Sequence, residues 1–174
     1  MASLIVVNCQ RPYLGKLDRA DQIRVVEEVQ DEAVIAQING DGIVCLQGES
    51  AQNDTHPSIV KCLEGHKRKL NITTDAGSAA TEAIKGMKRR RFSCSFITVC
   101  GIYTDIYLKD VVTELSQLLP HAEITVPIKA CCSYRKTKRA FEWVYDLSNV
   151  ELRRPRQRYT QHSQSYSQQR RWAI

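Results

Sequence analysis

Short apolar runs alternate with segments of helical periodicity along most of the 174 residues. Runs of four to seven mainly apolar residues predict buried strands at 3–9, 43–46, 96–100 and 122–128. Apolar residues spaced three and four apart predict amphipathic helices at 19–38, 75–87, 106–119 and 134–147. The polar segment 48–69 is predicted to be a long loop.

Caps and apolar faces can be assigned for three of these helices. Asp21 is predicted to cap the first helix and Asp75 the second. The core-facing stripe of the first helix is predicted to consist of Ile23, Val26, Val29, Ala33 and Val34. In the helix at 134–147, the side chains predicted to face inward are Phe141, Val144 and Tyr145.

The order of these elements defines a fold class. Strands that alternate with helices predict an α/β domain with a single doubly wound, mostly parallel sheet and helices on both faces. The length fits one such domain, which we place at residues 1–150, followed by a tail at 151–174. No apolar run reaches the 18 or so residues of a membrane helix, so no membrane association is expected.

Charge separates the tail from the body of the chain. The chain has 25 Lys and Arg against 19 Asp and Glu, and the tail from Leu152 onward has six arginines and no acid. The remaining 19 basic residues balance the 19 acids, so the tail carries the whole net charge of +6. Its Gln, Ser and Arg content is too polar to fold alone.

Arginine interleaved with aromatic residues suits RNA or DNA, or an acidic groove on a partner protein. We therefore predict a binding role for the tail, with an inert solubilising terminus as the alternative. The residues assigned to this role are Arg153, Arg154, Arg156, Arg158, Arg170, Arg171 and Trp172.

The seven cysteines are odd in number, lie mostly in apolar runs and include no CxxC pair. This pattern favours free thiols over a disulfide framework or a zinc ribbon. It places the chain in the cytoplasm or another reducing intracellular compartment, and no secretory signal is evident at the N-terminus.

Four segments resemble one family in the same order along the chain. They are LIVVNCQRPYLG (4–15), NDTHP (53–57), DAGSAATEAI (75–84) and VCGIYTDIYLKDVV (99–112). They are similar to the Asp-x-Gln strand end, the D-x-H-P segment, the D-x-Y-S-A-F run and the G-x-x-T-D-x-C-V turn of isochorismatase/nicotinamidase-like cysteine hydrolases. The resemblance implies an isochorismatase-like, Rossmann-like three-layer fold, and a homo-oligomer or a larger protein assembly.

The same comparison reveals departures at the positions that carry the family's chemistry. Tyr107 stands where the family has its nucleophilic cysteine, and Asn8 where it has its catalytic aspartate. The catalytic lysine would fall near Thr73, and Lys69 is the nearest candidate. The resemblance thus implies a degenerate pocket formed by Asn8, Lys69, Tyr103 and Tyr107.

These departures predict that the ordinary cysteine-hydrolase chemistry of the family is lost. A phenol with a pKa of about 10 is mostly protonated at neutral pH, and an asparagine amide is no general base. Cys9 and Cys100 are expected to be buried and structural, because Cys9 points away from Asn8 along the strand and Cys100 precedes the turn.

Two further groups of residues are candidate ligand sites. Asp54, His56 and His66 form a possible divalent metal site for Zn or Fe, and the alternative is a polar loop in which Asp and Pro form a turn. The basic runs 85–91 and 67–69 form a possible phosphate-binding patch, and we favour the alternative of a solvated helix end.

The sequence therefore predicts a non-catalytic isochorismatase-like domain, a pseudoenzyme that serves as a structural or binding module in a larger assembly. Its basic tail would contact nucleic acid or a partner protein. The alternative is an active hydrolase of small amides or related substrates that uses a rearranged site.

Overall fold

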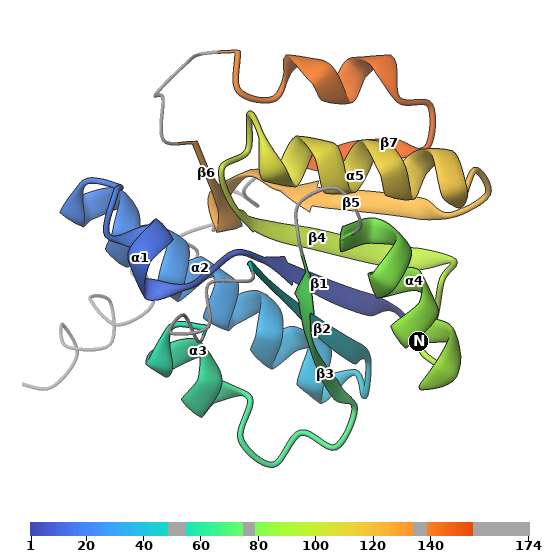
Figure 1. The fold of residues 1–174 in the computed structure, drawn as a ribbon, viewed down its shortest axis with the longest axis horizontal. Coiled ribbons are helices and arrows are strands. Elements are labelled where there is room, and N and C mark those ends of the chain that lie inside the picture. Colours follow the sequence, from blue (N-terminus) through green and yellow to red (C-terminus); the bar gives the residue numbers. More distant parts are fainter. Residues whose placement is uncertain (49–54, 75–78, 134–138, 155–174) are drawn as a thin grey trace, which may run out of the picture.

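A mostly buried parallel sheet organises the chain (Figure 1). The computed structural model describes residues 1–48, 55–74, 79–133 and 139–154. Within these residues, the sheet has the order β3-β2-β1-β4-β5-β7, and β6 pairs with β4 beyond the end of β5. The strands are β1 (Ser3–Val7), β2 (Gly42–Gly48), β3 (Lys69–Thr74), β4 (Phe96–Ile102), β5 (Glu123–Pro127), β6 (Cys131–Cys132) and β7 (Val150–Arg153). All pairings between these strands are parallel, which confirms the predicted fold class.

Helices cover both faces of the sheet. The helices are α1 (Arg11–Leu14), α2 (Arg19–Ile38), α3 (Pro57–Cys62), α4 (Ala79–Arg89) and α5 (Tyr107–Leu118), with short 3-10 helices η1 (Ile128–Ala130) and η2 (Glu142–Asp146). One face packs against α4 and α5, and the other packs against α2, which α3 and η1 flank (Figure 1). Among the described residues, no helix is long and apolar enough to span a bilayer.

The central strand β1 explains why the sheet is buried on both sides. All five of its residues are buried, because helices lie on both faces of the sheet at this point. A continuous apolar run is the pattern of a parallel strand in such a position. The strands β2 and β4 flank β1 in register, with Ile5 opposite both Val44 and Val99.

The helix α2 has the predicted bounds but a different cap and a different buried face. Its cap is Asp18, whose Oδ1 accepts the Asp21 N–H at 2.8 Å, because the chain enters the helix one turn earlier than the predicted cap. Ile23 is 49% exposed and Val34 42% exposed. The residues that turn toward the sheet are Val25, Val26, Val29, Ala33 and Ala36.

The segment predicted as a loop contains α3, and β3 begins at its last residue, Lys69. The helix α3 has only six residues and β3 lies at the edge of the sheet, so neither has enough apolar positions for a clear period. Leu70 and Ile72 pack under α4 where Gly86 has no side chain, since a Cβ there would lie 2.5 Å from Leu70 Cδ2. The edge strand is therefore held by helix packing rather than by its own pattern.

The C-terminal part of the body also differs from the prediction. Residues 134–138 lie outside the described residues, as does Asp75, and the helix predicted at 134–147 is represented by the 3-10 helix η2. Val144 is buried as predicted, whereas Tyr145 is 74% exposed because the tighter 3-10 turn rotates it outward. The strand β7 pairs with β5 and so carries the sheet three residues into the predicted tail.

The strands β1 and β4 are parallel neighbours, and the order in which strands are added to the sheet changes sides between them. Their carboxyl ends open a crevice there, because the connections after β1 and after β4 run to opposite sides. Gly101 closes the pairing with φ +135°, and a Cβ at this position would lie 2.1 Å from the Val7 carbonyl oxygen. The close approach of these two strands therefore requires glycine.

Substitution of this glycine tests that requirement. We expect Gly101→Ala to lower the free energy of unfolding by about 3 kcal/mol or more, because it adds a backbone clash to an unfavourable φ. The control is Gly40→Ala, where φ is +69° and no atom lies within 4 Å of the added Cβ. That variant is expected to lose only about 1 kcal/mol. Urea denaturation measures both, and equal losses would contradict the steric explanation.

Candidate functional site

The turn after β1 is built around Asn8 and Gln10. Asn8 has φ +52°, a left-handed conformation that asparagine tolerates better than most residues. Gln10 is fully buried, and its Oε1 accepts the Gly48 N–H at 2.8 Å while its Nε2 donates to the Gly48 carbonyl at 3.4 Å. This amide joins the ends of β1 and β2, so the glutamine of the Asp-x-Gln resemblance has a structural role here.

The turn after β4 is built around Tyr103, which has φ +61°. A left-handed aromatic residue is strained by about 1–2 kcal/mol, and its surroundings hold it in place. Its hydroxyl donates to the Tyr13 carbonyl at 3.2 Å, and its own carbonyl accepts the Ile106 N–H at 2.9 Å. Thr104 N–H donates to the Cys132 carbonyl at 3.2 Å, which ties the turn to β6.

Three tyrosine rings meet above these two turns. The ring centroids of Tyr13 and Tyr103 lie 5.8 Å apart, nearly perpendicular, and those of Tyr103 and Tyr107 also lie 5.8 Å apart. The Tyr13 and Tyr107 centroids lie 6.4 Å apart. Contacts of this geometry stabilise an aromatic cluster. Tyr103 is buried beneath the other two rings.

A pocket of about 150 Å³ opens beside this cluster at the carboxyl edge of the sheet. Asn8, Tyr13 and Tyr107 line it, and Tyr103 does not. Its lining residues come from the ends of β1, β2 and β3, from α1, and from the first turns of α4 and α5: Val7, Asn8, Tyr13, Leu46, Gln47, Gly48, Thr74, Ala79, Tyr107 and Val111. The structure therefore brings Asn8 and Tyr107 together as the resemblance implied.

The polar side chains among the described residues that line this pocket are neutral amides and hydroxyls. Among the described residues that line it, there is no cysteine, acid, lysine or histidine. Lys69, predicted as a pocket member, begins β3 at the opposite edge of the sheet, about 16 Å along the strand from Thr74. Thr74 occupies the strand end, so the prediction for Lys69 was wrong because the extent of β3 was not recognised.

Burial raises the pKa of four thiols in the core. Cys9 and Cys100 are buried, and burial raises the pKa of each well above its ordinary value. Burial also raises the pKa of Cys45 to about 11, although the positive charge of Lys69 opposes the shift. Cys131 is buried as well, which raises its pKa to about 12. These side chains are packing residues, as predicted for Cys9 and Cys100.

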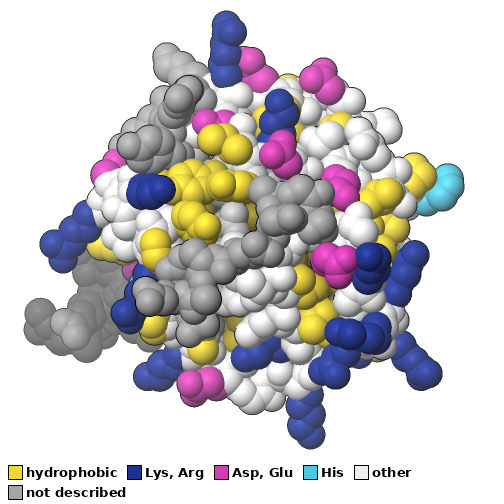
Figure 2. Space-filling view, in the orientation of Figure 1, with side chains coloured by type: hydrophobic (Ala, Val, Ile, Leu, Met, Phe, Trp, Pro, Cys, Tyr) yellow, Lys and Arg dark blue, Asp and Glu magenta, His cyan; other side chains and the backbone are white. Residues whose placement is uncertain are grey.

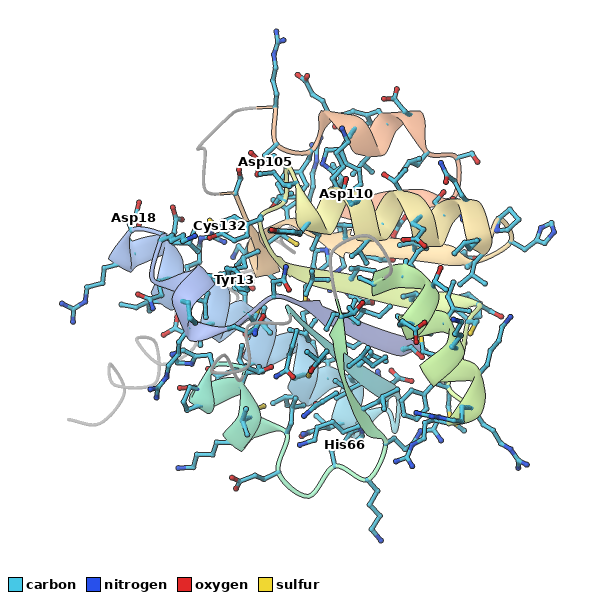
Figure 3. The ribbon with its side chains drawn as sticks, viewed as in Figure 1. Tyr13, Asp18, His66, Asp105, Asp110 and Cys132 are labelled. Atoms are coloured by element: carbon cyan, nitrogen blue, oxygen red, sulfur yellow. The ribbon has the colours of Figure 1, made fainter. Side chains whose placement is uncertain are left out.

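The two histidines of the predicted metal site lie at opposite edges of the sheet. His56 N–H donates to the Cys9 carbonyl at 2.7 Å at the carboxyl edge, and its Nδ1 accepts the Ser58 N–H at 3.3 Å as the cap of α3. Burial lowers the pKa of His56, and the neighbouring Arg11 adds to this effect. His66 Nε2 lies 2.9 Å from the Asp41 carbonyl oxygen, next to the amino end of β2 (Figure 3).

Since seven residues of β2 span about 20 Å, His56 and His66 cannot hold one ion. Asp54, the third predicted ligand, lies outside the described residues. In the described ranges, no cluster of three His, Cys, Asp or Glu side chains has the geometry of a metal site.

Two of the predicted tail arginines belong to the described part of the chain. Arg153 lies in β7, and its Nη2 forms an ion pair and hydrogen bond with Glu32 on α2. Arg153 thus ties the last strand to a helix. Arg154 is exposed, and the other predicted tail residues lie outside the described ranges.

Among the pocket residues that were not predicted from the sequence, three have polar side chains: Tyr13, Gln47 and Thr74. Tyr13 lies in the quoted CQRPYLG segment, but α1 is a single turn whose direction the sequence does not indicate. Gln47 and Thr74 are the last polar residues of two neighbouring strands. Polar residues at the carboxyl ends of neighbouring parallel strands could have been predicted to border one crevice. This was not possible for Thr74, because β3 was not recognised from the sequence.

Thiol labelling tests the assignment of the cysteines to packing. In the native chain at pH 7.5, we expect iodoacetamide to modify Cys9, Cys45 and Cys100 more than about a hundredfold more slowly than after urea unfolding, because few thiolates form in the buried state. The rate at Cys45 should rise about tenfold per pH unit toward its pKa of about 11. Peptide mass spectrometry locates the adducts. Rapid native labelling of Cys9 or Cys100 would contradict this assignment.

Comparisons with known proteins agree on the fold. No protein-family model matches the sequence, and no curated protein matches it. Among solved structures, pyrazinamidase/nicotinamidase from Streptococcus mutans superimposes with a TM-score of 0.70 at 15% identity, over 88% of this chain and 100% of that one. MAR1 ribonuclease from Caenorhabditis elegans superimposes with a TM-score of 0.71 at 13% identity, over 87% of this chain and 76% of that one.

An isochorismatase from Pseudomonas putida gives a TM-score of 0.68 at 14% identity, over 87% of this chain and 86% of that one. The order of the parallel strands and the placement of the helices account for this likeness. The chain has the isochorismatase-like α/β fold that these hydrolase structures share.

Proposed function

We propose that this protein is a non-catalytic isochorismatase-like domain that acts as a binding module. The observation that carries the proposal is the pair of residues at the carboxyl edge of the sheet: Asn8 after β1 and Tyr107 at the first position of α5, on the same pocket. In the resemblance, these are the positions of the catalytic aspartate and the nucleophilic cysteine.

Amide or ester hydrolysis through a covalent intermediate needs an activated nucleophile and a group that exchanges protons. A cysteine at the start of α5 would be favoured as a thiolate by the helix N-terminus. Tyr107 offers a phenol there, and Asn8 offers an amide that neither accepts nor returns a proton at neutral pH. Thr74 at the end of β3 supplies no positive charge to stabilise a developing anion.

The pocket is nevertheless suited to holding a small ligand. A cavity of about 150 Å³ accommodates one benzene-sized ring. The rings of Tyr13 and Tyr107 supply flat apolar surface, and the Asn8 and Gln47 amides supply donors and acceptors. Because the described lining carries no formal charge, the ligand class that fits best is a small, neutral, planar molecule with an amide or similar group.

Restoration of the missing groups tests the proposal. The wild type should show no turnover of nicotinamide, pyrazinamide or isochorismate in a coupled ammonia or pyruvate assay. The double variant Asn8→Asp/Tyr107→Cys, with and without Thr74→Lys, is expected to acquire measurable amidase activity, because it regains a thiol and a carboxylate on one pocket. Turnover by the wild type would contradict the proposal and support a rearranged active site.

The control for this experiment is Tyr145→Cys, which adds a thiol at a site that is 74% exposed and remote from the pocket. It should remain inactive. Activity in this control equal to that of the double variant would show that a thiol anywhere on the surface is enough for turnover. That result would contradict the assignment of Tyr107 to the position of the nucleophile.

The basic tail extends the proposal to a partner. The four arginines after Arg154 suit the phosphates of nucleic acid, and Trp172 suits its exposed bases. The rest of the chain, residues 1–151, is formally neutral. An acidic partner protein is the alternative occupant. In either case, the domain would serve a larger assembly within a reducing compartment.

Neutralising the tail in the full chain tests this role. Arg156, Arg158, Arg170 and Arg171 changed together to Gln should weaken binding to a 15-nucleotide oligouridylate. The slope of log affinity against log salt should fall by about 0.7 for each phosphate that the tail no longer neutralises. Fluorescence anisotropy at several salt concentrations measures both quantities. Affinity and salt slope equal to those of the wild type would rule out a nucleic-acid role for the tail.

A further inference from the structure

A second pocket lies at the amino edge of the sheet, opposite the pocket of Tyr107. It has a volume of about 280 Å³ and lies between the start of β3 and the end of α4. Its lining residues are Lys67, Arg68, Arg89, Arg90, Arg91 and Phe92. Figure 2 shows Lys and Arg side chains gathered at the lower right, over this part of the molecule.

Arg68 is held in place within this cationic pocket. Its guanidinium carbon lies 4.9 Å from the centre of the Phe92 ring, in a cation–π contact. Its Nη2 donates to the Arg91 carbonyl at 3.3 Å. Its Nε is buried and has no hydrogen-bond partner among the described residues. The Arg68 side chain is therefore held in one orientation by Phe92 and the Arg91 carbonyl.

Arg91 occupies a position where most proteins place glycine. The helix α4 ends with Phe92 N–H donating to the Met87 carbonyl at 2.9 Å and Arg91 N–H donating to the Lys88 carbonyl at 3.1 Å. This is a Schellman motif, in which the residue at the Arg91 position adopts the left-handed conformation and is usually glycine. Arg91 adopts it with φ +55°. The chain therefore has an arginine side chain at a backbone position that favours glycine.

The helix dipole accounts for only part of this charge. Cations in the last turn of α4, such as Lys88 and Arg89, offset the partial negative charge of the helix end. Lys67 and Arg68 come from the segment before β3 and converge on the same pocket. No carboxylate is present in its described lining, so the cations repel one another without an anion between them.

We propose that this cationic pocket binds the phosphodiester backbone of single-stranded nucleic acid. Four of its five cations are arginines, whose planar guanidinium groups match phosphate oxygens in pairs. Arg89 also lines an adjoining groove formed by β3 and α4, in which Lys85 is paired with Glu82 at 2.8 Å. A flexible single strand can follow a concave surface and place its phosphates against the arginines of the cationic pocket itself.

The lack of exposed apolar side chains in the described lining of the pocket disfavours a membrane as the ligand. Interfacial binding to lipid is strengthened by apolar side chains that insert between headgroups, in addition to the attraction of basic residues. Phe92 is the one apolar residue of the described lining, and it is 7% exposed because it packs inside the domain. The cationic pocket therefore presents charge without an insertable side chain. Neither the pocket of Tyr107 nor the tail contributes a residue to its described lining.

Full-length variants with a 5′-fluorescein-labelled 15-nucleotide oligouridylate test the assignment by anisotropy. Arg68→Gln should weaken binding about tenfold, and Arg91→Gly about three- to tenfold. Each should lower the salt slope by about 0.7, because one phosphate is no longer neutralised. Arg91→Gly also relieves the left-handed strain, so its weaker affinity cannot come from unfolding. The charge-matched control is Arg19→Gln, an exposed cation at the other edge, which should change affinity less than twofold.

Each pocket variant is also made in the chain whose tail arginines are Gln. Equal fold-changes in affinity in both backgrounds support the cationic pocket as a site separate from the tail. Wild-type affinity and salt slope in the Arg91→Gly variant would overturn the inference. Weaker oligonucleotide binding that appears only in the chain with the neutralised tail would overturn it too. Binding to phosphatidylserine vesicles that depends on Arg68 and Arg91, without such dependence for the oligonucleotide, would overturn it as well.

Discussion

The close approach of β1 and β4 is the constraint on which the rest of the structure depends. These strands run in register from Ser3 opposite Ile97 to Val7 opposite Gly101. At the last pair, the Val7 carbonyl occupies the space that any side chain at position 101 would need. The connections after the two strands leave in opposite directions from this point, so their turns border one crevice. Asn8 and Tyr103 both adopt left-handed conformations in these turns.

This arrangement separates two sites with different chemistry. The carboxyl edge of the sheet has a neutral pocket with two tyrosine rings and amide groups. The amino edge has a pocket lined by five cations and one buried aromatic ring. The strands between them place the pockets on opposite sides of the core. The chemistry at one edge can therefore differ from that at the other without a change in the fold.

Much of the fold could be predicted from local pattern. The helix α2 has the predicted bounds because its apolar spacing and the Asn39-Gly40 stop are local signals, although its cap is Asp18 and not the predicted Asp21. The central strands are apolar on both faces, which is a strong signal. The edge strand β3 and the helix α3 were missed because a half-exposed strand and a six-residue helix have too few apolar positions to show a period.

The candidate site shows what the sequence by itself determined and what only the tertiary structure decided. The sequence determined that Tyr107 and Asn8 stand at two motif positions, because strand-turn-helix junctions are encoded locally by glycine and apolar runs. Only the tertiary structure decided that they share a pocket with Tyr13 and Thr74, that His56 and His66 are separated by the length of a strand, and that Arg68 stacks on Phe92. Spacing along a chain does not report which edge of a sheet a residue reaches, because that depends on where each strand begins and ends.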